Sequence, residues 1–375
     1  MQHKLTIGYH NATLFARKDD TELTHTRRTL LVGALALPAL MLAGCSTKTS
    51  TPTTGSTSPT TGSTASNAGS AGASGAGAPK LAAKAHYKVG FAQVESNNPF
   101  RLAETKSMQD EAAKRGDQIV VTDATGSDAK QISDINTMIA QQVDAIFLAP
   151  HAEKPLASAV LNAKRAGIPV ILIDRRVDPA IAKPGQDYVT FIGSDFVAQG
   201  KRAADWLIKS TNGKAKIIEM EGSAGSSPAI DRKKGFDDEI KTQPGMTIVA
   251  SQNADFNRDK GRQVMETLLQ SHPEVTAVYA HNDEMALGAV SALQAGNKQP
   301  GTAVKVVSID GSRDAVQAIV DGKINYVVQS SPFFGPVAFQ SLSDYAAGKP
   351  IPARVVVKDN AYDASNAKQS LPAAF

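Results

Sequence analysis

The sequence predicts an α/β protein with two similar lobes, each holding a parallel sheet flanked by helices. Short apolar runs alternate regularly with amphipathic stretches, which is typical of parallel sheets wound with right-handed crossovers. Several runs are continuous in Val, Ile and Leu, as expected for strands that are covered on both faces. The runs are too numerous for one compact sheet of this type, so two lobes of about five strands each are expected.

The N-terminal residues 1–45 are interpreted as a lipoprotein signal peptide. A basic pair, Arg27-Arg28, precedes an apolar stretch from Leu30 to Leu42, which is short for a membrane span and ends in small residues. The stretch closes on the letters LAGC, which resemble a lipobox, so Cys45 is the expected lipidation site. It is the only cysteine, which excludes a disulfide within the chain. The basic pair leaves Sec and twin-arginine export both open.

Residues 46–85 are interpreted as a flexible linker. They are rich in Ser, Thr, Gly, Ala and Pro and hold few large apolar side chains, too few to offset the entropy lost on ordering. The remaining residues are enough for one large or two medium domains. The formal net charge of +4 is spread through the chain without a basic block, which argues against nucleic-acid binding.

The elements of the folded body follow one another as strand and helix. Amphipathic helical periodicity is clear at 129–142 and 260–270. The expected strands are 88–94, 118–123, 145–149, 170–174, 189–194, 216–220, 248–251, 277–280, 304–309 and 326–329.

Polar and aromatic side chains gather where these strands end. Ligands of doubly wound sheets bind beyond the carboxyl ends of strands, so these side chains are candidate ligand contacts. They are Asn98, Phe100, Arg101, Asp174, Arg175, Arg232, Phe256, Asn282, Asp310 and Gln329. Carboxylates and amides accept hydrogen bonds from sugar hydroxyls, guanidinium groups donate to them, and aromatic rings offer flat faces to the C–H side of a sugar. The set therefore favours a polyhydroxylated ligand.

Some residues of these loops fit a structural role, such as a helix cap or a turn, as an alternative to a ligand contact. Asp283 fits the N-cap of a helix better than a ligand contact, and Asp310 before a glycine fits a turn. Of Arg175 and Arg176, at least one is expected to be solvated. Glu95 is expected on the surface.

Six motifs, in order from residue 86 to the C-terminus, resemble a known family. They are "VGFAQVESNNPFR", "IPVILIDRRV", "AIDRKKGF", "ADFNRDKGRQVMETLL", "VYAHNDEMALGA" and "VVSIDG". Together they are similar to the periplasmic sugar-binding proteins of the ribose- and galactofuranose-binding family, which serve ABC importers. The resemblance implies a type I periplasmic binding protein fold, whose two lobes are joined by crossing hinge strands and close over one monosaccharide.

The resemblance also implies where the lobes and walls lie. The N-terminal lobe is expected at 86–192 and 330–351, and the C-terminal lobe at 193–329 and 352–375. The first wall is expected to hold Asn98, Phe100, Asp174 and Arg175, and the second Arg232, Phe256, Asn282 and Asp310, with Gln329 near a hinge strand. A permease and an ATPase are the implied protein partners, the protein is expected to be a monomer, and no cofactor or metal is implied.

One departure bears on the sugar. Ribose binders carry a second aromatic residue after the Asn-Pro-Phe, whereas this chain has Arg101. A guanidinium in place of a ring removes a stacking face and adds up to five donors, which suits a ligand with more exocyclic hydroxyls. A furanose sugar is expected, with a hexofuranose of the galactofuranose kind favoured. Gln329 and "NNPF" favour ribose, so a pentose stays open.

Two other function classes lack support in the sequence, and a third stays open. An enzyme lacks support, because the chain has no familiar metal-ligand spacing, no P-loop and no G-x-S-x-G. A DNA-binding repressor of the LacI type shares the core that the resemblance implies but begins with a helix-turn-helix, where this chain is expected to carry a lipid signal. A sugar sensor that feeds a membrane receptor stays open. The expected location is exported, on the periplasmic or cell-surface face, lipid-anchored to a bacterial membrane.

Overall fold

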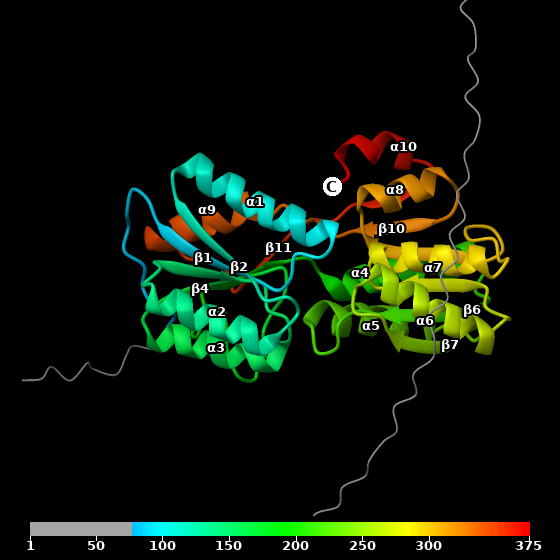
Figure 1. The fold of residues 1–375 in the computed structure, drawn as a ribbon, viewed down its shortest axis with the longest axis horizontal. Helices are drawn as coiled ribbons and strands as arrows, with labels where there is room; N and C mark the ends of the chain where they lie inside the picture. Colours follow the sequence, from blue (N-terminus) through cyan, green and yellow to red (C-terminus); the bar gives the residue numbers. More distant parts are fainter. Residues whose placement is uncertain (1–76) are drawn as a thin grey trace, which may run out of the picture. The chain divides into compact units, whose positions relative to one another are not determined.

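The first lobe contains a parallel six-stranded sheet. The structure, a computed structural model, describes residues 77–375 (Figure 1). The strand order is β11-β5-β4-β3-β1-β2, and all neighbours pair in parallel. Its strands are β1 (Lys88–Gln93), β2 (Gln118–Asp123), β3 (Ala145–Leu148), β4 (Val170–Ile173), β5 (Thr190–Gly193) and β11 (Arg354–Val356).

The second lobe contains a second six-stranded sheet of the same design, with the order β12-β10-β9-β8-β6-β7. Only its edge strand β12 runs antiparallel, against β10. Its strands are β6 (Ala215–Glu221), β7 (Met246–Asn253), β8 (Ala277–Ala280), β9 (Lys305–Asp310), β10 (Tyr326–Gln329) and β12 (Ala361–Asp363). This confirms the predicted fold class.

Helices cover both faces of each sheet. Those of the first lobe are α1 (Pro99–Arg115), α2 (Asp128–Ala140), α3 (Glu153–Arg165) and α9 (Gly335–Ala346). Those of the second are α4 (Phe196–Ser210), α5 (Ser227–Ile240), α6 (Arg258–Ser271), α7 (Asp283–Ala295), α8 (Arg313–Val320) and α10 (Ala367–Ser370), followed by the 3₁₀ turn η1 (Leu371–Ala373).

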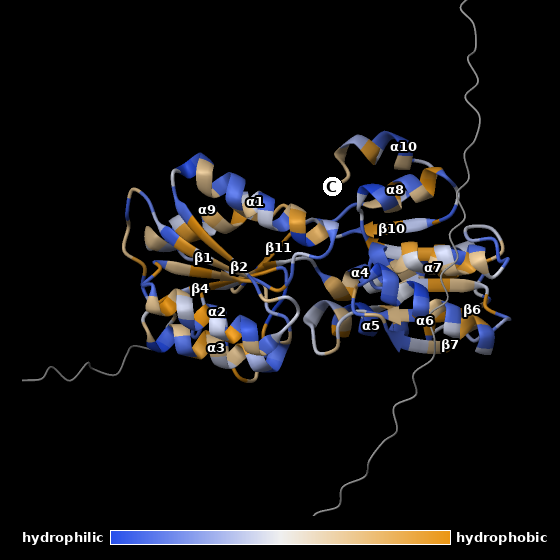
Figure 2. Cartoon of the chain, in the orientation of Figure 1, coloured by the Kyte–Doolittle hydropathy of each residue, from blue (hydrophilic) through white to orange (hydrophobic). Residues whose placement is uncertain are grey.

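Burial of both faces of the sheet explains why the strands are continuously apolar. In β3, Ile146 packs into the core shared with α2 and α3, and its neighbour Phe147 packs into the core shared with α1 and α9. Successive side chains of a strand point to opposite faces, so every residue of this strand must be apolar. Figure 2 shows the same result for both sheets, with hydrophobic strands between helices whose outer faces are hydrophilic.

The chain crosses between the lobes three times, after β5, after β10 and between β11 and β12. The crossing segments are tied together by side chains. The Ser194 hydroxyl lies 3.4 Å from that of Ser330 and donates to an Asp359 carboxylate oxygen at 3.0 Å. The neighbouring Gln199 amide also donates to Asp359, at 2.8 Å.

Two details differ from the sequence predictions. The edge strands β11 and β12 were not predicted, because each spans three residues and shows no periodicity. The boundary predicted at residue 352 is wrong, since β11 pairs with β5 and so belongs to the first lobe.

Within residues 77–375, no helix is long and apolar enough to cross a membrane. The expected signal peptide, Cys45 and most of the expected linker lie outside the described residues.

Candidate functional site

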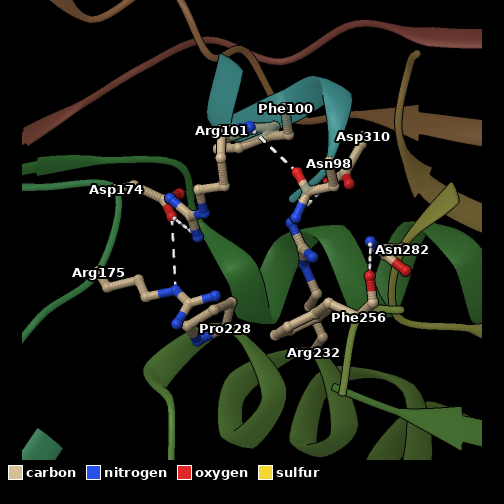
Figure 3. A pocket seen from close by; sticks show the side chains of 10 residues that line it. All are labelled: Asn98, Phe100, Arg101, Asp174, Arg175, Pro228, Arg232, Phe256, Asn282 and Asp310. Atoms are coloured by element: carbon tan, nitrogen blue, oxygen red, sulfur yellow. Dashed lines mark hydrogen bonds and ion pairs between the residues drawn. The ribbon is translucent and has the colours of Figure 1, made fainter. Parts of the chain in front are cut away.

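A small pocket lies where strand ends of both sheets face each other, and Figure 3 shows its walls. The empty space between its walls is small, about 300 Å³ when the part open to solvent is included. It is lined by Asn98, Phe100, Arg101, Asp174, Arg175, Pro228, Arg232, Phe256, Asn282 and Asp310. All of them are buried. The structure thus brings together every predicted ligand contact except one, and it adds Pro228 from the first turn of α5.

The residue left out is Gln329. It ends β10, and its side-chain oxygen accepts hydrogen bonds from the main-chain and side-chain nitrogens of Asn360, at 3.1 and 2.9 Å. Gln329 therefore holds one of the crossing segments in place, as expected for a residue near a hinge strand. It does not line the pocket.

The first turn of α1 supplies one wall. Asn98 caps the helix, accepting from the main-chain nitrogen of Arg101 at 3.0 Å, and Pro99 follows at the position where a proline costs the helix no hydrogen bond. This cap aims the next two side chains, Phe100 and Arg101, at the pocket (Figure 3). The crowded turn after β1 is thus a helix start that carries a ring and a guanidinium.

The Arg101 guanidinium is held by two carboxylates. It lies 2.7 Å from Glu104, one turn along the helix, and 2.8 Å from Asp174 at the end of β4. Burial alone would lower the pKa of Arg101, but the charges of Asp174 and Glu104 outweigh it and raise the pKa above its usual range. Burial raises the pKa of Glu104. Gln93 in turn donates to Glu104 at 2.9 Å.

Glu104 and Gln93 were missed by the sequence analysis. Both are fully buried, and the second carboxylate oxygen of Glu104 has no hydrogen-bond partner among the described residues. A signal existed, since Glu104 stands three positions after Arg101 on one helix face. The position of Gln93 inside an apolar strand carried no comparable signal.

Arg175 has fewer partners than its neighbours. Its Nε has no hydrogen bond within the described residues, lies 3.7 Å from Asp174, and an outer nitrogen donates to the His151 carbonyl at 3.3 Å. Its guanidinium sits 5.4 Å from the centre of the Phe256 ring. Burial, then the charge of Arg101, lowers the pKa of Arg175 to about 10. A buried donor without a partner at the pocket wall is available to a ligand.

Arg232 on α5 anchors the opposite wall. It donates to Gln199 at 2.9 Å, to the His281 carbonyl at 2.6 Å and to Asp310 at 3.3 Å. Burial raises the pKa of Asp310 well above its ordinary value, although Arg232 acts against this shift. In the same wall, the Asn282 side chain donates a hydrogen bond to the Phe256 carbonyl at 3.2 Å and so fixes the main chain at that residue.

Behind this wall lies a buried pair, Glu219 and His281, which the sequence did not indicate. The His281 ring lies 3.1 Å from Glu219, and Lys233 and Ser251 also bond to that carboxylate. Burial alone would raise the pKa of Glu219, but these hydrogen bonds outweigh it and bring the pKa down to about 2. The pair fixes the main chain whose carbonyl receives Arg232.

Three pocket residues have a positive φ, namely Asp174 (60°), Phe256 (57°) and Asp310 (138°). Such conformations cost on the order of 1–3 kcal/mol each in residues other than glycine and cluster at functional sites. Here they turn a carboxylate or a ring from the end of a strand into the space between the lobes. These positive φ angles were not predicted from the sequence.

Two structural roles expected from the sequence are wrong. Asn282, not Asp283, caps α7, accepting from the main-chain nitrogen of Met285 at 3.0 Å. Asp283 is buried and accepts from the Ser308 hydroxyl at 2.6 Å and from two main-chain nitrogens after β9. Glu95 is buried rather than exposed and accepts from Asn97 at 2.9 Å.

Direct contacts join the lobes beside the pocket. The Arg176 guanidinium pairs with Glu153 of its own lobe at 2.8 Å and with Asp231 of the other, so Arg176 is not simply solvated. Its main-chain nitrogen donates to Ser227 at 3.0 Å, and the Glu153 main chain donates to that of Gly225 at 3.0 Å. Because the pocket is buried and these contacts join the two lobes, the structure shows the lobes in a closed arrangement. Among residues 77–375, no group of three His, Cys, Asp or Glu side chains is placed to hold a metal.

Comparisons with known proteins agree with this architecture. The profile of a family described as "Periplasmic binding protein domain" matches residues 89–350. The galactofuranose-binding protein YtfQ of Escherichia coli is 37% identical over 79% of this chain and 94% of its own. The ribose import binding protein RbsB of Bacillus subtilis is 36% identical over 72% and 84%. A Mycobacterium smegmatis crystal structure in complex with β-D-fucofuranose has 43% identity and a TM-score of 0.73, covering 76% of this chain and 94% of that one.

Proposed function

Because the chain belongs to the periplasmic binding protein domain family, we propose that it is the substrate-binding component of an ABC sugar importer. It holds one monosaccharide between its two closing lobes. The observation that carries this proposal is the pocket itself, which is buried, small and lined by hydrogen-bonding side chains from both lobes. The Arg176–Asp231 ion pair supports closure as the means of sequestering the ligand.

The chemistry of the walls favours a neutral polyhydroxylated ligand. Each of the three arginines at the pocket has a carboxylate partner within the protein, Glu104 and Asp174 for Arg101, Asp174 for Arg175 and Asp310 for Arg232, so none of them requires an anionic ligand. Each sugar hydroxyl both donates and accepts, and the walls offer both functions. Phe100 and Phe256 are the rings that supply apolar faces. The site is proposed to bind without catalysis.

Within this class we favour a furanose form, with a hexofuranose ahead of a pentofuranose. The support is Arg101, which adds donors where ribose binders carry a ring, together with relatives named for galactofuranose and a similar structure bound to β-D-fucofuranose. The alternative is ribose or another pentose, supported by the ribose import relative. A sensor that reports sugar to a membrane receptor would use the same site.

A sugar panel tests the proposal. D-ribose, L-arabinose, D-fucose, D-galactose and myo-inositol are titrated by calorimetry and by thermal shift, because a ligand that binds only the folded state must raise the melting temperature. Binding of at least one aldose is expected, with myo-inositol as the control of similar size. If no aldose binds, the proposed function is contradicted.

We further propose that the protein is exported and lipid-anchored through Cys45, with the Ser/Thr-rich linker as a tether, and that it acts as a monomer beside a permease and an ATPase. More than one acyl chain is needed for stable attachment, as expected for a bacterial lipoprotein. Cys45→Ala should move the protein from the membrane to the soluble fraction. A variant that stays as membrane-bound as wild type would contradict the anchor.

A further inference from the structure

The last segment of the chain begins in the second lobe. The strand β12 pairs with β10, and α10 and η1 pack beside α8. Ala367 is buried in the core of that lobe, and Leu371 and Ala374 pack against it. The segment up to residue 374 thus packs on the second lobe.

Phe375 leaves that core and enters the other. Its ring packs against the apolar core of the first lobe and meets the Phe100 ring edge to face, with the ring centres 5.8 Å apart and the planes at 80°. Its main-chain oxygen stays with the second lobe, accepting from the main-chain nitrogen of Arg313 at 2.7 Å. The point where the chain ends in Figure 1 lies beside the start of α1, as this contact requires.

This geometry places one residue across both lobes. When the lobes part, the Phe375 ring cannot stay on Phe100 while its main chain stays on Arg313, so one of the two contacts must break. The two contacts of Phe375 therefore exist together only in the closed arrangement. Phe100 also lines the pocket, with the Arg101 guanidinium 5.0 Å from its ring centre. The contact thus supports the ring that faces the ligand.

We propose that Phe375 is a positioning residue that couples lobe closure to the placement of the Phe100 ring. It touches no ligand itself, as it does not line the pocket. By stabilising only the closed form, it raises the fraction of protein able to retain a sugar, and the apparent affinity rises with that fraction. The proposal rests on the proposed sugar-binding function.

The expected effect is on release and is the same for every sugar. Loss of one aromatic pair corresponds to about three- to tenfold weaker binding. Because Phe375 can contact both lobes at once only after closure, loss of its ring should raise the dissociation rate while the association rate stays near that of wild type. The ratio between sugars should not change, since Phe375 reaches none of their hydroxyls.

Three variants test this. Phe375→Ala removes the ring, Phe375→Tyr keeps it, and Val337→Ala trims another half-buried side chain of the same first-lobe core on α9. Dissociation constants and stopped-flow release rates are measured for each sugar of the panel that binds wild type, with melting temperatures as a check on folding. We expect three- to tenfold weaker binding and faster release for Phe375→Ala alone. Values for Phe375→Ala within twofold of wild type, or an equal loss in Val337→Ala, would overturn the proposal.

Failure of the proposed function gives a different result. If no sugar of the panel binds wild type, the contact is tested alone by amide hydrogen exchange in the full chain. Exchange across residues 98–104 and at the start of α8 should then be faster in Phe375→Ala than in wild type and Phe375→Tyr. Unchanged exchange in both segments would overturn the positioning role without reference to any ligand.

Discussion

We predict that the ion-paired Arg101 has two separable roles, one in stability and one in the choice of sugar, and a pair of substitutions distinguishes them. The side chains of Arg101, Glu104 and Asp174 are 5%, 0% and 4% exposed. Arg101→Phe introduces the ring that ribose binders carry, but it leaves two buried carboxylates without their shared arginine. Asp174 keeps Arg175 at 3.7 Å, whereas Glu104 loses its only cation among the described residues.

The expected cost follows from the loss of one partner of a buried pair, about 3–5 kcal/mol of unfolding free energy. Adding Glu104→Leu to Arg101→Phe gives a double variant in which the unpaired Glu104 carboxylate is also removed. Replacing both partners by apolar groups is often nearly neutral, so the double variant should recover about 2–3 kcal/mol of the loss. Urea denaturation of wild type, both single variants and the double variant measures the coupling. A double variant no more stable than Arg101→Phe would refute this reasoning on the ion pair.

Sugar choice should not be recovered with stability. A hydrogen bond from a charged donor contributes about 1.5–3 kcal/mol, so loss of Arg101 should weaken D-galactose or D-fucose binding at least tenfold while D-ribose binding changes little. The furanose fraction of each sugar in solution is the same for all variants and cancels from the ratio of dissociation constants. We expect the hexose-to-pentose ratio to rise at least tenfold in both Arg101→Phe and the double variant. An unchanged ratio in both would leave Arg101 with a structural role only.

Three further predictions concern other parts of the site. Asp310→Ala leaves Arg232 without its carboxylate and should weaken every bound sugar tenfold or more by calorimetry, and wild-type affinity in a folded variant would place the site elsewhere. Glu219, with a folded-state pKa of about 2 against an ordinary 4.5, contributes stability that is present above about pH 4.5 and is lost as the pH falls through 2. The stability difference between wild type and Glu219→Gln in urea titrations should therefore shrink by up to about 3 kcal/mol from pH 5 to 2, and a constant difference would contradict this pKa. Arg176→Ala removes the ion pair with Asp231 between the lobes, worth up to about 1 kcal/mol at a partly exposed site, so small-angle scattering should give a larger radius of gyration for the ligand-free variant than for wild type. Equal radii would mean that the pair does not hold the clamp closed.

The sequence by itself determined the two-lobe α/β fold and most of the pocket wall. Strand runs such as β3 are recognisable because burial on both faces requires every residue to be apolar, a condition that neighbouring residues reveal. In parallel sheets the carboxyl ends of strands share one edge, so polar residues after several strands had to converge. This geometry brought Asp174 and Asp310 into one pocket although 136 positions separate them in the numbering.

Only the tertiary structure decided how those side chains are held. The pairing of Arg101 with Asp174, the place of Gln329 outside the pocket and the buried Glu219–His281 pair depend on distances between loops that no local pattern encodes. The same holds for β11, which is too short to show a period and is a strand only because β5 lies beside it. In the sequence, Phe375 is one apolar residue after small ones, and its contacts with both Phe100 and Arg313 exist together because the two lobes are closed. Local periodicity records which face of an element is buried, whereas a site shared by two lobes is set by their mutual placement.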